Sequence, residues 1–75
     1  MPKLYSSSAI IKVLERRGFL FVSQKGSHMK FRKENGHETL TVIVVANKKE
    51  IPFGTFKSIL RQSGLSEEEF KLQKK

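Results

Sequence analysis

The stretch that decides the fold is HMKFRKENGHETLTVIVVA, residues 28–46. Its polar and apolar side chains alternate on both sides of an Asn-Gly pair, and alternation with a period of two is typical of a strand buried on one face only. Asn35 and Gly36 both tolerate the positive φ that a tight hairpin turn requires. The sequence therefore predicts antiparallel strands over 28–34 and 37–46, joined by a two-residue turn at Asn35-Gly36.

The predicted turn fixes the register of this hairpin, and the register sorts the side chains onto two faces. It sets Lys33 opposite Glu38 and Phe31 opposite Leu40. One face collects the apolar side chains that we expect helices to cover, namely Met29, Phe31, Leu40 and Val42. The other face stays open to solvent, and it carries His28, Lys30 and Arg32 beside Thr39, Thr41 and Ile43. The sheet is thus predicted to be covered on one side and cationic on the other.

Two segments before the hairpin have clear local signals. The hydroxyls of Ser6-Ser7-Ser8 offer an N-cap to a predicted helix over 9–17, and Gly18 follows where a left-handed residue commonly ends a helix. The aromatic and β-branched residues of 19–22 predict a strand that stops at the Lys25-Gly26-Ser27 turn. The chain is therefore expected to run from a helix into a strand and then into the hairpin.

Two helices are predicted after the hairpin. Pro52 suits the first turn of a helix that Gly64 ends, and Ser66 and Glu69 have the spacing of a capping box for a short last helix. The order of elements is then α-β-β-β-α plus a short C-terminal helix. This order predicts an α+β fold with a three-stranded antiparallel sheet and helices on one face.

The composition indicates one small, basic domain over residues 1–75, with a core over about 6–66 and a charged tail, 67–75. Cysteine is absent, so no disulfide or thiolate-bound metal is expected, and a reducing cytoplasm is the expected compartment. No apolar run is long enough for a membrane span or a signal sequence, so we expect a soluble protein without a membrane partner. The net charge of +8 belongs to the body, because the tail holds three Glu and three Lys. A basic body predicts a polyanionic partner, with nucleic acid first.

Two side chains, His28 and His37, have the chemistry to move a proton near neutral pH. Roughly 20 Å of strand separates them in the predicted hairpin, so they cannot act on one bond. The carboxylates are scattered, which predicts chemistry without a metal or other cofactor. His28 has the more useful surroundings, because it follows a Gly-Ser turn and lies between Lys25 and Lys30. A lone histidine at a sheet edge is also common without any role, and the residues alone leave both interpretations open.

Four short segments together carry a resemblance to a known family. They are GF at 18–19, QKGSH at 24–28, KKEI at 48–51 and GTFKSILRQSGL at 54–65. In this order the chain, from about Ser6 to Ser66, resembles the HicA-type toxins, which are small messenger-RNA interferases of bacterial and archaeal toxin-antitoxin pairs. The resemblance implies a fold of the double-stranded-RNA-binding-domain type and a catalytic histidine at His28. Many relatives end the third strand in a Val-Pro-x-His-like segment, where this chain has Val44-Val45-Ala46-Asn47.

The resemblance also implies an activity and a partner. It implies a metal-independent endoribonuclease that cleaves messenger RNA and is neutralised by a HicB-type antitoxin covering His28, with His28 as general acid or base. We expect the RNA to be bound by Lys25, Ser27, Lys30, Arg32, Lys48, Lys49, Lys57 and Arg61. One alternative is a non-catalytic RNA-binding module of the same shape, whose phosphate clamps are Lys48, Lys49, Lys57 and Arg61. Another is a protein-interaction role, in which the basic face docks an acidic partner.

Overall fold

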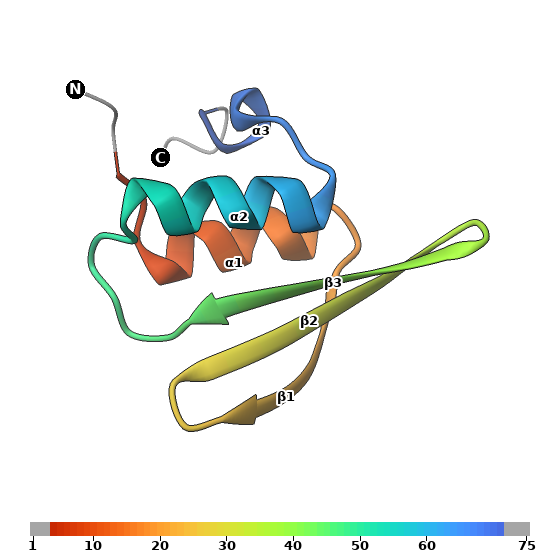
Figure 1. Ribbon diagram of the computed structural model, residues 1–75, viewed down its shortest axis with the longest axis horizontal. Helices are drawn as coiled ribbons and strands as arrows, with labels where there is room; N and C mark the ends of the chain where they lie inside the picture. Colours follow the sequence, from red (N-terminus) through yellow and green to blue (C-terminus); the bar gives the residue numbers. More distant parts are fainter. Residues whose placement is uncertain (1–3, 72–75) are drawn as a thin grey trace.

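The computed structural model describes residues 4–71 and has the predicted order of elements (Figure 1). They are α1 (Ser7–Arg16), β1 (Leu20–Lys25), β2 (His28–Asn35), β3 (Glu38–Val45), α2 (Phe53–Ser63) and α3 (Glu67–Lys71). The strands form one antiparallel sheet in the order β1-β2-β3, and Figure 1 shows the helices on one side of it. The predicted α+β fold is therefore confirmed. Met1–Lys3 and the end of the predicted tail, 72–75, lie outside the described residues.

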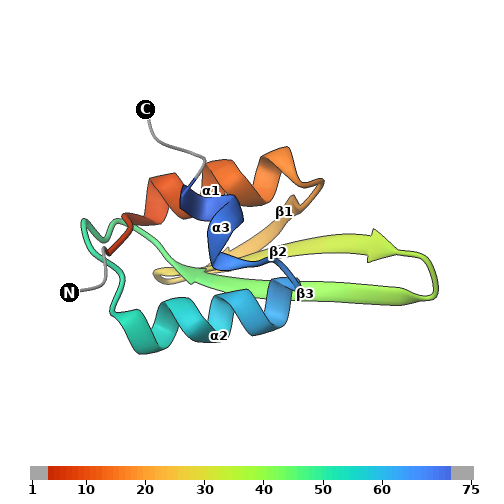
Figure 2. The same ribbon diagram turned by 90° about the horizontal axis from the view of Figure 1, so that it is seen from above.

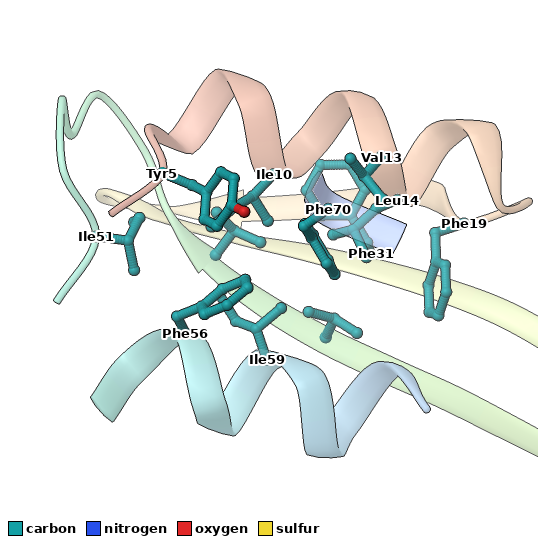
Figure 3. Close-up of a cluster of buried hydrophobic side chains, with 12 residues drawn as sticks. Tyr5, Ile10, Val13, Leu14, Phe19, Phe31, Ile51, Phe56, Ile59 and Phe70 are labelled. Carbon is teal, nitrogen blue, oxygen red and sulfur yellow. The ribbon is translucent and has the colours of Figure 1, made fainter. Parts of the chain in front are cut away.

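The hydrophobic core lies between the helices and the covered face of the sheet (Figure 3). Ile10 and Leu14 come from α1, Phe31 from β2 and Phe56 from α2, and each is at most 1% exposed. The apolar residues of α1 recur at helical spacing and those of β2 at a spacing of two, so each element presents one apolar side to the same space. This packing leaves the opposite face of the sheet uncovered.

The short helix α3 completes the core, and Figure 2 shows it between α1 and α2. Phe70 is 1% exposed, with its ring centre 5.1 Å from that of Phe56 and 6.1 Å from that of Tyr5. The Arg17 guanidinium pairs with the Glu69 carboxylate and ties α3 to the end of α1. Burial raises the pKa of the Tyr5 hydroxyl, and the neighbouring carboxylate of Glu67 raises it further. Phe70 thus docks α3 on the body of the protein.

The register of the β2–β3 hairpin differs from the predicted one by two residues. Phe31 lies opposite Val42, not Leu40, and the two-residue turn is Gly36-His37. Gly36 takes the positive φ of 67° while His37 stays at negative φ, which is the sign pattern of a type II′ turn. A slip of two residues keeps every side chain on its predicted face, whereas a slip of one would have exchanged the faces.

The predicted Lys33–Glu38 pair does not form in this register. Lys33 lies opposite Leu40, and its ammonium is 5.7 Å from the centre of the Phe19 ring, where a cation–π contact replaces the expected ion pair. Glu38 lies opposite Asn35 beside the turn. The covered face therefore ends in a lysine that packs over an aromatic ring of the core.

Side chains from both long helices bond the outer edge of β3. The backbone N–H of Ile43 donates to Gln62 Oε1 of α2 at 3.2 Å. The Ser7 hydroxyl of α1 donates to the Val45 carbonyl at 2.5 Å and accepts from the Lys48 N–H at 2.9 Å. Because Ser7 is buried and bonded in this way, α1 begins two residues earlier than predicted, with Ser6 as its N-cap. These bonds fix the end of β3 against both helices.

Candidate active site

The turn Gly26-Ser27, between β1 and β2, holds His28 in place. Gly26 has a φ of 61°, a conformation that glycine adopts without a steric penalty. The Ser27 carbonyl accepts a hydrogen bond from the N–H of Ala46 at 2.6 Å, which ties the turn to the loop after β3. His28 is the first residue of β2, opposite Lys25 on β1 and Val45 on β3. Its backbone is therefore fixed on both sides.

His28 shares the open face with three cationic side chains. Phe31 is buried on the covered face, so the alternation of β2 puts His28, Lys30 and Arg32 on the open one. Lys25 lies directly opposite His28, and residues paired in this way point to the same face with Cβ atoms roughly 5 Å apart. His28, Lys25 and Arg32 are exposed and Lys30 is half-buried. The structure thus brings together four of the residues predicted for the site, at a face where a phosphate is attracted.

Gln24 belongs to this region, although the predicted site residues do not include it. Its Nε2 donates to the Gly26 carbonyl at 2.8 Å, and it lies opposite Met29 on the covered face. Because the peptide bond is trans, the Ser27 N–H points away from that carbonyl. Within residues 4–71 this N–H makes no hydrogen bond, so it is a donor beside His28. The one signal in the sequence is an amide side chain two residues before the turn glycine.

The remaining predicted RNA-binding residues fall into two groups. Lys48 and Lys49 are exposed in the loop after β3, close in sequence to Ala46 and so at the end of the sheet that carries His28. Lys57 and Arg61 lie on α2, on the covered side of the sheet. The Lys57 ammonium is 5.7 Å from the centre of the Phe53 ring. The structure therefore does not bring Lys57 and Arg61 to the open face.

His37 lies at the opposite end of the hairpin. It is exposed in the Gly36-His37 turn, which Figure 1 shows projecting beyond the helices. Glu34 and Glu38 are its nearest charged neighbours in the sequence. The length of β2 separates it from His28, and at about 3.3 Å per residue this exceeds roughly 20 Å. The two histidines cannot act on one bond within a chain.

The described part of the chain offers neither a cluster of metal ligands nor a helix that could span a membrane. Across residues 4–71, no three His, Cys, Asp or Glu side chains come together in a way that could hold a metal ion. None of the helices in that range combines the length and the apolar character that crossing a membrane requires.

Comparison with known families gives a match that covers most of the chain. Residues 7–65 of the 75-residue chain match the family model described as the HicA toxin of bacterial toxin-antitoxin. The matched range begins at the first residue of α1 and ends just after α2, and so contains the whole sheet and the Gly26-Ser27-His28 turn. A search of curated proteins produced no match.

Proposed function

We propose that this chain, which belongs to the HicA toxin family of toxin-antitoxin systems, acts as an endoribonuclease that cleaves messenger RNA. Family membership establishes the toxin role, and the arrangement around His28 supports the reaction. The observation that best supports this proposal is the position of His28. It is exposed, follows a turn that is hydrogen-bonded to the loop after β3, and lies on a cationic face opposite Lys25 and two residues from Lys30. The toxin is proposed to act in the cytoplasm, where messenger RNA is translated.

The reaction needs little from the protein because RNA carries its own nucleophile. The 2′-hydroxyl loses its proton and its oxygen attacks the adjacent phosphorus. The bond from phosphorus to the 5′-oxygen then breaks and that oxygen takes up a proton, which leaves a 2′,3′-cyclic phosphate and a 5′-hydroxyl. We assign the proton transfer to the His28 imidazole, as base toward the 2′-hydroxyl or acid toward the 5′-oxygen. Such transfer contributes on the order of 10² to 10⁴ in rate.

The cationic side chains beside His28 are assigned to the phosphate. Lys25 and Lys30 neutralise the scissile phosphate. Arg32 lies two residues after Lys30 on the same face of β2. The Ser27 N–H, aimed by the bond from Gln24 to Gly26, donates to a phosphate oxygen that gains charge in the transition state. Lys48 and Lys49 extend this surface along the RNA backbone. The proposed mechanism uses no metal ion.

A HicB-type antitoxin is the proposed neutralising partner. A partner that neutralises the toxin must keep RNA from reaching His28. It can do so by covering the open face of the sheet. A partner with acidic side chains suits this face, because Lys25, Lys30 and Arg32 all lie on it. Binding of such a partner does not by itself separate a nuclease from a non-catalytic RNA-binding module, whereas cleavage does.

The test is RNA cleavage by the purified chain in EDTA. We expect cleavage of a single-stranded messenger fragment that leaves a 2′,3′-cyclic phosphate, and no cleavage where the nucleotide on the 5′ side of the cut is 2′-O-methylated. Expression of the chain alone should arrest bacterial growth. If the methylated RNA is cut as fast as the unmodified RNA, the assigned chemistry is wrong. If RNA is bound but never cut, the non-catalytic module is the better account.

A further inference from the structure

The β1 strand forms one edge of the sheet, and every side chain in it is exposed. Leu20, Phe21 and Val22 keep 72%, 52% and 42% of their surface in solvent. These are three consecutive large apolar side chains, and leaving apolar surface in water costs about 25 cal/mol per Å². The same residues within a strand that paired on both edges would lose much of that exposure. The apolar segment 20–22 therefore marks β1 as a contact surface.

The two edges of the sheet differ in whether side chains bond their outward backbone groups. At β3, Gln62 bonds the outward N–H of Ile43 and Ser7 bonds the outward carbonyl of Val45. At β1, no side chain among residues 4–71 reaches the outer backbone in this way. An edge with unpaired N–H and C=O groups is a template for another strand, and native proteins usually cover such edges or place charges along them. Here β1 carries one charge, Lys25, at its end.

The backbone at the turn end of β1 is suited to pairing. The pair beside a two-residue turn, Lys25 with His28, is the hydrogen-bonded kind, so the N–H and C=O of Gln24 point away from β2. A bulge between Phe21 and Ser23 interrupts the regular ladder farther back. The edge thus offers a short regular backbone over 23–25 and apolar side chains over 20–22. Both features match recognition by addition of an extended peptide.

The charge around β1 indicates which kind of strand can bind to its free edge. Residues 16–33 contain six Lys or Arg and no Asp or Glu; the six are Arg16, Arg17, Lys25, Lys30, Arg32 and Lys33. A second copy of this chain pairing through β1 would bring two such cationic segments, 16–33 of each copy, close together, which like-charge repulsion opposes. An acidic strand in the same place gains attraction instead. A nucleic acid has the right charge but cannot form the backbone ladder that the free edge offers.

We propose that the free edge of β1 binds an extended, acidic segment of a partner protein, which adds a fourth strand to the sheet. Side chains that point to the open face beside Lys25 are acidic, and those that point to the other face are apolar and contact Phe21. This binding does not depend on the nuclease activity. One consequence does rest on the proposed function, namely that the added strand, two strand spacings or about 10 Å from His28, keeps RNA away from it.

The experiment uses the full chain, labelled with ¹⁵N, and a blocked synthetic peptide of alternating Glu and Val as the probe. We expect amide shifts concentrated in 20–25 and slower hydrogen exchange at the Gln24 amide. A peptide of the same sequence whose backbone is N-methylated keeps the charges and the valines but cannot pair, and it should bind at least about tenfold more weakly. A peptide of alternating Lys and Val should not bind.

Phe21→Thr provides the matching change in the protein. It introduces a β-branched residue that suits a strand and removes the half-exposed apolar side chain that the valines of the peptide would contact, so it should weaken peptide binding several-fold. His37→Ala, at the far end of the hairpin, should leave peptide binding unchanged. Equal binding by the N-methylated peptide, or shifts confined to 28–32, would overturn the proposal in favour of simple charge attraction to the open face.

A single-stranded RNA of matched charge separates the two classes of partner. If that RNA, added without the peptide, slows exchange of the Gln24 amide as the peptide does, the edge is a nucleic-acid surface and the proposal is wrong. The outcome is also distinct from that of the nuclease test. Peptide binding at β1 in a chain that never cuts RNA would leave this proposal standing and remove the proposed function.

Discussion

The two hairpins of the sheet turn in the same way but place their histidines in opposite surroundings. Each turn begins with a glycine at positive φ, 61° for Gly26 and 67° for Gly36. The first turn is tied to the loop after β3 through Ser27, and its histidine lies among lysines. The second turn projects beyond the helices, and its histidine lies between Glu34 and Glu38 in the sequence (Figure 1).

This comparison shows that the local turn motif does not decide which charges surround the histidine. What differs is the neighbouring strand and the charge it carries. A phosphate that approaches His28 meets Lys25 and Lys30, whereas one that approaches the other turn meets carboxylates. Attraction between unit charges about 4 Å apart is near 1 kcal/mol in water and larger at a protein surface. We therefore propose the imidazole of His28, and not that of His37, as the group that acts on RNA.

The largest expected difference between the two hairpins is in catalysis. His28→Ala should lower the single-turnover rate of RNA cleavage by about 10² to 10⁴, because the proton-transfer group is lost. Both histidines are exposed, so neither substitution should change the thermal unfolding midpoint appreciably. His37→Ala is the matched control and should cleave at the parent rate. A folded His28→Ala protein that cleaves as fast as the parent would contradict the assignment of His28.

The two turn glycines, Gly26 and Gly36, give a second contrast. Substituting either should reduce stability equally, but only one substitution should reduce activity. A Cβ added at Gly26 or Gly36 meets no atom within 4 Å, so each Gly→Ala change carries only the strain of positive φ, roughly 1–2 kcal/mol. Both variants should show a similar loss of unfolding free energy in urea. Only Gly26→Ala should also slow cleavage, because its turn aims the Ser27 N–H. Equal cleavage by the two variants, measured where both are folded, would show that the turn does not contribute.

The cationic surroundings of His28 can be tested separately through salt. Lys30 lies on the open face, whereas Lys33, three residues along the same strand, packs over Phe19 on the covered face. Lys30→Ala should weaken RNA binding and reduce the slope of log affinity against log salt by about 0.7. Lys33→Ala should change that slope much less, and His28→Ala should leave it nearly unchanged while removing cleavage. A similar loss of slope from both lysine variants would place RNA off the open face.

Strand faces could be predicted from the sequence, but the register of the hairpin could not. Alternation assigns Phe31 to the covered face and His28 to the open one in any register that differs by two residues. The preference of Asn-Gly pairs for tight turns predicted a turn at Asn35-Gly36. Burial of apolar side chains instead favours the observed register, with the turn at Gly36-His37. In the predicted register Val44 lies beyond the start of β2, whereas in the structure it lies opposite Met29 and is fully buried. Packing of the apolar end of β3 therefore outweighed the local turn preference.

The same distinction explains how much of the candidate site could be predicted. Lys25, His28 and Lys30 come together because a tight turn and one strand suffice to place them, and both can be read locally. Lys57 and Arg61 lie on the covered side because of the way α2 packs, which helical spacing alone does not reveal. The role of Gln24 depends on the direction of one peptide plane, and the one signal in the sequence, an amide side chain two residues before the turn glycine, does not fix that direction.

The smallest expected effect concerns this peptide plane at Gln24. Gln24→Ala removes the bond to the Gly26 carbonyl, and a lost hydrogen bond of about 0.5–1.5 kcal/mol corresponds to roughly a two- to tenfold slower cleavage step. Because Gln24 is exposed on an edge strand and bonds only the turn, RNA affinity and the unfolding midpoint should barely change.

Gln24→Lys retains an N–H donor on a side chain of similar reach, so it should recover part of the rate, whereas Gln24→Glu has no donor and should not. The Ser27 amide signal reports the same plane independently of RNA, and it should move in the alanine and glutamate variants. An unmoved Ser27 signal together with an unchanged cleavage rate would show that the turn needs no help from Gln24. In that case the difference between the two hairpins would rest on charge alone.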